Sequence, residues 1–198
     1  FPVMVPLWMI PLAITAGNTF ILKPSEQTPL AGLRLAEYLK QAGLPDGVFN
    51  VVNGAKTIVE ALCDHQDIKA VAFVGSSSVA KIVYNRCSQN SKRSLCLGGA
   101  KNHMIVVPDA DTDSTAKGLL ASSMGSAGQR CMAASVAVGV ANIDHIIDQL
   151  VEEARNFKLG VDMGTIISKN SLDRITGYID EAEKMGAKIL VDGRDISP

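Results

Sequence analysis

The sequence has almost no excess of charge of either sign. Its 19 lysines and arginines nearly balance 20 aspartates and glutamates, which gives a formal net charge of -1. It contains no basic stripe of the kind that binds nucleic acid, and no polybasic cluster of the kind that holds a protein on an anionic membrane. We therefore expect a partner that is a small molecule, with no nucleic acid and no membrane.

Long hydrophobic runs are also missing. The longest, "MVPLWMIPLAI" at 4–14, contains two prolines and is too short to cross a bilayer. No basic residue precedes it, so it lacks the form of a signal peptide. The sequence begins without methionine and ends on "DGRDISP". We expect it to be the central segment of a longer protein.

Cysteine is scarce and irregularly spaced. The four cysteines, at 63, 87, 96 and 131, match no zinc-binding pattern and no Cys-x-x-Cys redox motif. This favours a reducing compartment. The expected location is the cytoplasm, or the mitochondrial matrix if the source is eukaryotic.

Apolar strand patterns alternate with helical ones in the first half of the chain. Strands are predicted at 18–23, 47–54 and 68–75, and helices at 28–43, 55–65 and 76–89. The alternation indicates parallel βαβ units, hence an α/β fold. The nearly continuous apolar run "AVAFV" is typical of a sheet that is covered on both faces.

The second half repeats this style after a pair of glycines. Strands are predicted at 93–97, 104–108, 132–140 and 188–193, and helices at 111–128, 142–160 and 169–187. The best candidate for a boundary is "LGGAK" at 97–101. We therefore expect two α/β blocks, at 1–99 and 100–198.

The stretch "GSAGQRCMA" at 125–133 places Cys131 among small residues. A lone cysteine is often a small buried hydrophobe. However, this one lies between a predicted helix and a predicted strand, where backbone N–H groups can face a developing oxyanion. No histidine partner is evident, and both interpretations stay open at this point.

Two further stretches follow predicted strands. "FVGSSS" at 73–78 opens a helix, whose N-terminus can bind phosphate, although an ordinary N-cap is the simpler interpretation. "LKPSEQTP" at 22–29 places Lys23 and Glu26 at a strand end, where α/β sheets bind ligands. A solvated surface charge pair explains this second stretch equally well.

Four motifs together resemble the aldehyde dehydrogenase superfamily. They are "AGNTFILKPSEQTP", "AVAFVGSSSVAK", "LGGAKNHMIVVPDAD" and "GSAGQRCMA", in that order. The likeness covers essentially the whole chain, and "GAKNH" is most similar to the methylmalonate-semialdehyde branch, which is NAD-dependent and CoA-acylating. The resemblance implies parallel sheets with flanking helices, with a Rossmann-like NAD-binding part at 1–99 and part of the catalytic domain at 100–198.

The resemblance also implies roles for particular residues. Cys131 would be the catalytic thiol, which adds to an aldehyde to give a thiohemiacetal and then a thioester, with its own N–H as one arm of the oxyanion hole. Arg130 is a candidate for binding a substrate carboxylate, or for a salt bridge that shapes the loop. The remaining residues would bind NAD: Lys23 and Glu26 at the adenosine ribose, Gly75 and Ser76 at the pyrophosphate, and Leu97, Gly98 and Gly99 at the nicotinamide pocket beside Cys131.

One position departs from the hydrolytic members of the superfamily. The resemblance places their water-activating glutamate at Leu97, and leucine cannot act as a general base. This favours transfer of the acyl group to coenzyme A. An asparagine of the oxyanion hole, a ribose-binding glutamate and an oligomerisation hairpin would lie outside the sequence.

Three functions therefore remain open. The first is an acylating semialdehyde dehydrogenase, which is expected to be a homo-oligomer when full length. The second is a hydrolytic aldehyde dehydrogenase. The third is a non-catalytic fragment that at most binds nucleotide.

Overall fold

The computed structural model describes residues 1–194, which form two compact units, Phe1–Gly99 and the chain from Ala100 onward. Both units combine helices with parallel strand pairs, so the predicted α/β class is confirmed. The assignment of NAD binding to the first unit and catalysis to the second stays a prediction. None of the helices within residues 1–194 is both long and apolar enough to cross a membrane.

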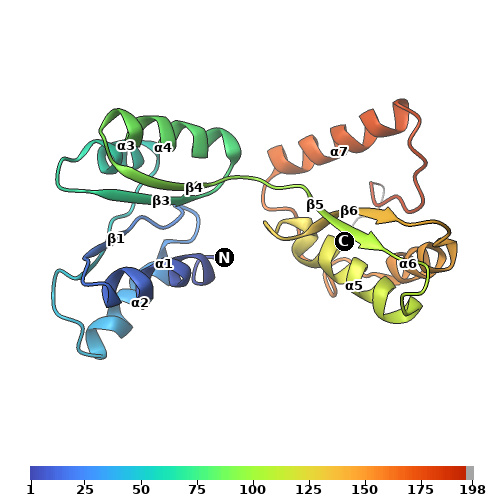
Figure 1. Cartoon of the computed structure of the whole chain (residues 1–198), viewed down its shortest axis with the longest axis horizontal. Helices are drawn as coiled ribbons and strands as arrows, with labels where there is room; N and C mark the ends of the chain where they lie inside the picture. The colour runs from blue at the N-terminus through green and yellow to red at the C-terminus, as the bar shows by residue number, and fades with distance from the viewer. Residues whose placement is uncertain (195–198) are drawn as a thin grey trace. The chain divides into compact units, whose positions relative to one another are not determined.

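The first unit is built from two parallel strand pairs, β1–β2 and β3–β4 (Figure 1). A helix connects the two strands of each pair, so each is a βαβ unit. The elements are α1 (Met4–Thr15), β1 (Phe20–Leu22), α2 (Pro29–Gln41), β2 (Phe49–Val51), α3 (Lys56–Asp64), β3 (Ala70–Val74), α4 (Ser77–Gln89) and β4 (Arg93–Leu97). The three strands predicted at 18–23, 47–54 and 68–75 do not form one continuous ladder, because no hydrogen bonds join β1 or β2 to β3.

Local sequence explains where the α2 helix begins and ends. Pro29 is its first residue, where the missing N–H of proline costs nothing and its fixed φ suits the helix. Gly43 follows the helix with a φ of +90°, and its N–H donates to Lys40 O. That left-handed conformation favours glycine and ends the helix.

The core of the first unit lies between α3, α4 and the β3–β4 pair. Cys63, Val83 and Cys87 are buried there, and Val59, Val71, Phe73 and Cys96 pack against them. Both helices lie on the same side of the strands in Figure 1. Leu95, on the other side of β4, is 55% exposed.

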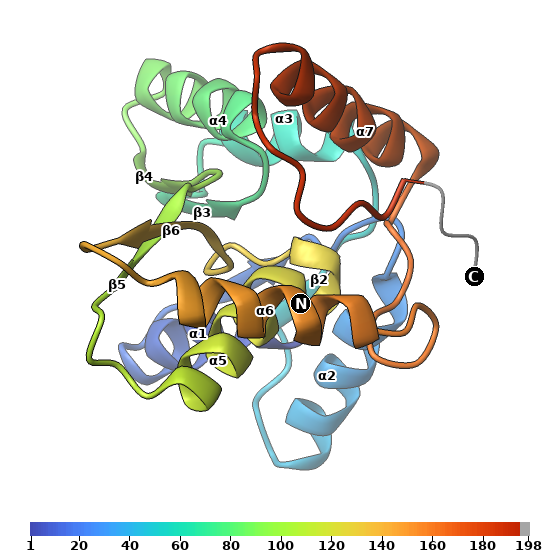
Figure 2. The ribbon, with the colours of Figure 1, turned by 90° about the vertical axis from the view of Figure 1, so that its right-hand side faces the viewer.

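The second unit has one parallel pair, β5–β6, whose register shifts between Asn102 and His103. Helices α5 and α6 lie side by side on one face of this pair (Figures 1 and 2). Between them and β5 lies a core of Val106, Leu119, Ile143 and Ile146. The elements are β5 (Asn102–Val106), α5 (Thr112–Met124), the 3₁₀ turn η1 (Gly125–Gly128), β6 (Ala134–Gly139), α6 (Asp144–Asn156) and α7 (Lys169–Lys184).

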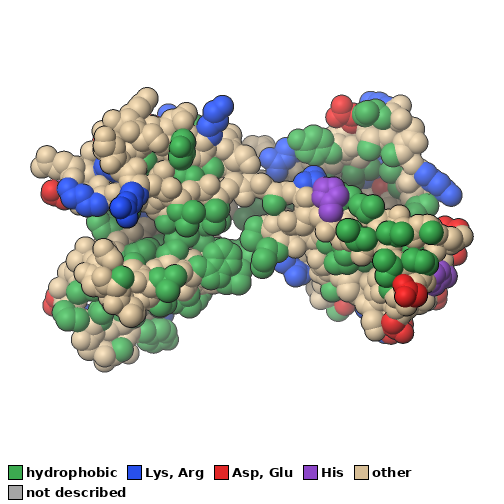
Figure 3. Space-filling view, viewed as in Figure 1, with side chains coloured by type: hydrophobic (Ala, Val, Ile, Leu, Met, Phe, Trp, Pro, Cys, Tyr) green, Lys and Arg blue, Asp and Glu red, His purple; other side chains and the backbone are tan. Residues whose placement is uncertain are grey.

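The opening apolar run, for which the sequence predicted no helix or strand, is the helix α1, which contains Pro11. Several detailed predictions are wrong. No strand forms at 188–193, and the helix predicted at 111–128 ends at Met124, where η1 begins. The β3–β4 pair, which contains "AVAFV", is open on one face, where Leu95 is 55% exposed, and the β5–β6 pair is open on one face, where Ile105 is 71% exposed. Figure 3 shows hydrophobic side chains gathered over β5 and β6 on this open face.

The burial of Ile146 predicts a large effect on stability. Its side chain is fully buried between α6 and β5. We expect Ile146→Ala to lower the free energy of unfolding by about 2–5 kcal/mol, because it removes buried apolar contacts and leaves a cavity. Urea unfolding of the purified chain measures this. Ile167→Ala, at a site that is 70% exposed, is the control and should change stability by less than about 0.5 kcal/mol. Equal losses in the two variants would contradict this account of the core.

Candidate functional site

Two of the predicted motifs meet at the carboxyl ends of β3 and β4. The Gly75 N–H donates to Leu97 O at 3.1 Å, and the Gly99 N–H donates to Ser77 Oγ at 2.9 Å. A Cβ on Gly98 would lie only 3.0 Å from the Cα of Ser77. Glycine is therefore required where the loop after β4 crosses the start of α4.

The start of α4 is suited to an anion. Ser76 is its N-cap, but its side chain makes no capping hydrogen bond and instead lies 3.2 Å from Ser78 Oγ. Ser76 therefore holds the predicted N-cap position, but its hydroxyl does not cap the helix. The first-turn N–H groups have no partner within the helix, and together with the helix dipole they favour a phosphate group.

Lys23 and Glu26 meet at the carboxyl ends of β1 and β2. Lys23 Nζ donates to Gly54 O at 2.8 Å and to Pro24 O. It lies 3.7 Å from Glu26 Oε2, with the lysine side chain 17% and the glutamate side chain 62% exposed. The lysine is held by backbone carbonyls, which leaves the glutamate carboxylate as the accessible acceptor. Their roles at a ribose stay predictions.

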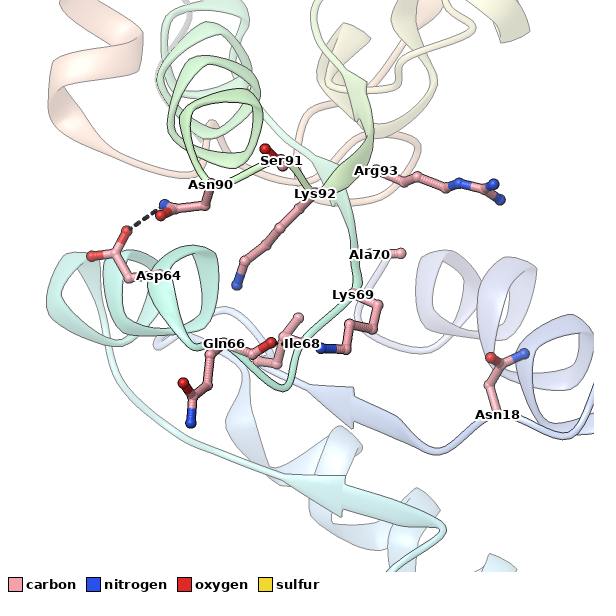
Figure 4. Close-up of a pocket in the computed structure, with 10 residues that line it drawn as sticks. All are labelled: Asn18, Asp64, Gln66, Ile68, Lys69, Ala70, Asn90, Ser91, Lys92 and Arg93. Carbon is pink, nitrogen blue, oxygen red and sulfur yellow. Dashed lines mark hydrogen bonds between the residues drawn. The ribbon is translucent and has the colours of Figure 1, made fainter.

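A hollow of about 640 Å³ lies at the opposite edge of the β3–β4 pair. Figure 4 shows that most of its lining comes from residues that precede or begin β3 and β4, and that Asn18 reaches it from the segment between α1 and β1. Two lysine ammonium groups of the lining already donate hydrogen bonds to backbone carbonyls. Lys69 Nζ donates to Gln66 O, and Lys92 Nζ donates to Leu62 O and His65 O. Ligands of parallel α/β sheets bind at the carboxyl ends of strands. We therefore place the candidate cofactor site at the Gly75 and Leu97 edge.

In the second unit, Cys131 lies in a turn between η1 and β6. The Ala133 N–H donates to Arg130 O at 3.2 Å, which closes the turn. The side chain of Cys131 is exposed, so its interpretation as a small buried hydrophobe is wrong. Within residues 1–194 the Cys131 N–H donates to no protein acceptor. The thiol can act as a nucleophile, and the N–H beside it can donate a hydrogen bond to the oxyanion that the attack produces.

The chain is strained immediately before this turn. Ser126 and Ala127 both have a φ of +54°, and Gly128 follows at +68°. The left-handed conformation costs a residue with a side chain about 1–2 kcal/mol. Strain of this kind accumulates at functional sites when the surrounding contacts enforce it.

Arg130 folds back over the end of α5. Its Nη2 donates to Ala121 O at 3.4 Å, and its guanidinium occupies the space that a Cβ on Gly125 would need. Among the residues that the structure describes, no carboxylate forms an ion pair with Arg130, so the predicted salt bridge is absent there. Its role in binding a substrate carboxylate stays a prediction.

Two amide side chains hold the Cys131 turn, and neither was predicted from the sequence. Asn102 Nδ2 donates to Cys131 O at 2.8 Å and to Ala133 O at 3.0 Å. Gln129 Oε1 accepts from the Ile167 N–H at 2.9 Å. The position of Asn102 inside "GAKNH", next to the predicted domain boundary, is the one signal that singled out its neighbourhood.

The other thiols differ from Cys131 in exposure. Cys63 and Cys87 are buried, and Cys96 is partly buried. Burial, followed by the hydrogen bond with Cys87, raises the pKa of Cys63 to about 11. Burial also raises the pKa of Cys96. Because the thiolate is the reactive form, Cys63 and Cys96 are poor nucleophiles near neutral pH.

Comparison with known proteins gives a consistent result. A profile described as "Aldehyde dehydrogenase family" matches residues 1–198. A malonate-semialdehyde dehydrogenase of Lacticaseibacillus casei is 50% identical, over 98% of this chain and 41% of its own length. The acylating mitochondrial methylmalonate-semialdehyde dehydrogenase of Arabidopsis thaliana is 49% identical, over 99% of this chain and 33% of its own.

A solved structure shows the same fold. It is described as a methylmalonate-semialdehyde dehydrogenase of Sinorhizobium meliloti complexed with NAD, and it is 48% identical with a TM-score of 0.96. The likeness covers 100% of this chain and 42% of that one. This chain thus spans about two fifths of the length of the first relatives that it matches.

The difference between the thiols predicts an order of alkylation. In the native chain at mildly alkaline pH, we expect iodoacetamide to modify Cys131 first and Cys63 and Cys87 only after denaturation. The reason is exposure, together with the raised pKa of Cys63. Peptide mass mapping over time measures the order. Modification of Cys63 as fast as Cys131 would refute the prediction.

The left-handed turn predicts an unusual response to glycine. Ala127→Gly should leave the free energy of unfolding unchanged or raise it, because glycine adopts a φ of +54° without strain. Ala121→Gly, at an exposed position in α5, should lower it by about 1 kcal/mol. Chemical denaturation compares the two variants, and an equal loss in both would show that no strain is relieved at Ala127.

Proposed function

The chain belongs to the aldehyde dehydrogenase family, and from this premise we propose that its protein oxidises a semialdehyde to an acyl thioester, with Cys131 as the nucleophile. The observation that carries the proposal is the exposed Cys131 thiol beside its own N–H, which meets no acceptor within residues 1–194. Covalent capture of a carbonyl needs both groups, one to attack the carbon and one to stabilise the oxygen.

The chemistry at Cys131 follows from these two groups. The thiolate sulfur adds to the aldehyde carbon, and the carbonyl oxygen becomes an oxyanion that the Cys131 N–H stabilises. The thiohemiacetal then loses its hydrogen as hydride while the oxygen re-forms its double bond to carbon, which leaves a thioester on Cys131. NAD, when bound, supplies the acceptor for that hydride.

Two features of the first unit suit NAD: the hydrogen-bonding groups at its strand ends, and the closely packed glycine loop after β4. The start of α4, at Gly75 and Ser76, offers N–H groups to the pyrophosphate. The Glu26 carboxylate, with Lys23 beside it, would accept hydrogen bonds from the adenosine ribose hydroxyls. The loop after β4, at Leu97, Gly98 and Gly99, would lie along the nicotinamide end, and its glycines allow a close approach of backbone.

We further propose that the acyl group passes to coenzyme A. Leu97 cannot activate water, and the Arabidopsis relative is named as acylating. The thiol of coenzyme A would attack the thioester carbon, release acyl-CoA and return the Cys131 thiol. The names of the relatives suggest malonate or methylmalonate semialdehyde as the substrate, with Arg130 as a candidate for binding its carboxylate.

Two properties of the whole protein remain proposals. The first is assembly into a homo-oligomer. The second is a location in the cytoplasm, or in the mitochondrial matrix of a eukaryote; the Arabidopsis relative is named as mitochondrial.

The test is NADH formation by the protein that carries this sequence, with malonate semialdehyde as the substrate. We expect continuous NADH formation only when coenzyme A is present, with no more than one NADH per Cys131 in its absence. Cys131→Ser should lower the rate to background, because the hydroxyl is a much weaker nucleophile. The increase in absorbance from NADH measures the rate. Cys96→Ser is the matched control and should keep the activity. Equal rates without coenzyme A would favour a hydrolytic enzyme, and no NADH from the unmodified protein would favour a non-catalytic one.

A further inference from the structure

The backbone on both sides of Cys131 is fixed by hydrogen bonds. The peptide group before it is held because Arg130 O accepts the Ala133 N–H at 3.2 Å. The peptide group after it is held because Cys131 O accepts from Asn102 Nδ2 at 2.8 Å. Because peptide groups are planar, fixing both of them fixes φ and ψ at Cys131.

These two constraints also direct the Cys131 N–H. In a trans peptide the N–H points opposite to the carbonyl of the same plane. Since Arg130 O points into the turn, the Cys131 N–H points out of it, and it meets no protein acceptor within residues 1–194. The direction of this donor therefore depends on the hydrogen bonds that hold the turn.

The strand pairing of β5 and β6 places Asn102 where it can make this contact. It is the first residue of β5 and pairs with Ala134, whereas His103 pairs with Val136, so Ser135 is an extra residue in β6. A bulge of this kind redirects side chains at the end of a strand. The same Nδ2 also donates to Ala133 O at 3.0 Å. Because both neighbours of this atom are carbonyl oxygens, which only accept hydrogen bonds, it must be the NH₂ group of Asn102 and not its oxygen. This fixes the orientation of the Asn102 amide.

We propose that Asn102 is a positioning residue, which holds the Cys131 turn so that the Cys131 N–H faces the oxyanion formed when the thiol attacks a carbonyl. The inference rests on the proposed role of Cys131 as a nucleophile. Asn102 touches neither the aldehyde nor the cofactor in this account and acts through the backbone of Cys131. Its contribution is limited to reactions in which an oxyanion forms.

Two reagents separate this role from simple exposure of the thiol. p-Nitrophenyl acetate acylates the thiolate: a C–S bond forms through an oxyanion intermediate, and nitrophenolate leaves with the electron pair of the broken C–O bond. Iodoacetamide alkylates the same sulfur by displacing iodide, without an oxyanion. Both reactions need the same exposed thiolate. A change in the thiolate fraction or in the solvent exposure of Cys131 therefore alters both rates alike and leaves their ratio unchanged.

The experiment measures this ratio by peptide mass mapping in the purified 198-residue chain, for the wild type, Asn102→Ala and Asn102→Asp. We expect both substitutions to lower the ratio about tenfold, because each removes the two donated hydrogen bonds. Asn102→Asp keeps the shape of the side chain, so the test does not depend on the folding of the alanine variant alone. An unchanged ratio in both variants would overturn the proposal.

A matched control tests whether a general loss of stability has the same effect. Asn142 Oδ1 accepts from the Asp144 N–H at 2.9 Å at the start of α6, so Asn142→Ala removes a comparable hydrogen bond elsewhere in the same unit. We expect its ratio to equal that of the wild type. A fall as large as in the Asn102 variants would overturn the proposal, because the effect would then not be specific to the turn.

The wild type distinguishes this inference from the proposed function. If the ratio at wild-type Cys131 is no higher than for glutathione, Cys131 is not an activated acyl acceptor, and both the proposed function and this inference fail. If the wild-type ratio is higher and the Asn102 variants keep it, only the role of Asn102 fails.

Discussion

The hydrogen bonds that fix the peptide groups on either side of Cys131 are the constraint on which the rest of this account depends. They come from within the turn, through Arg130 O, and from β5, through Asn102. Without them an exposed cysteine would be an ordinary surface thiol. With them the Cys131 sulfur and the Cys131 N–H, which meets no acceptor within residues 1–194, keep a fixed geometry relative to each other.

A second constraint operates in the first unit, where close packing brings two motifs together. The loop after β4 crosses the start of α4 so closely that a side chain at Gly98 would meet the backbone of Ser77. The Gly99 N–H then bonds to the Ser77 hydroxyl, while Ser76 leaves the first turn of α4 uncapped. Parallel strands place such loops at one edge, so the anion-binding character of this edge follows from the βαβ connection itself.

The sequence predicted the regular elements of the first unit well, because its signals are local. Apolar spacing and the stop at Gly43 define α2, and the βαβ alternation predicts parallel pairing. The prediction was poorer where tertiary context decides: no element was predicted for the opening run that forms α1, and the apolar pattern at 188–193 formed no strand. Cys131 could be found from its neighbours, but Asn102 could not, because its contact depends on a bulge between strands far apart in sequence.

The most direct test of the central claim is to find the covalent intermediate. The protein would be incubated with malonate semialdehyde and NAD but without coenzyme A, quenched in acid, digested and examined by mass spectrometry. The account predicts an acyl group in thioester linkage on the peptide that contains Cys131, lost when coenzyme A is added before the quench. An acyl group on Cys63, Cys87 or Cys96 instead, or no adduct on any cysteine while NADH is formed, would contradict it.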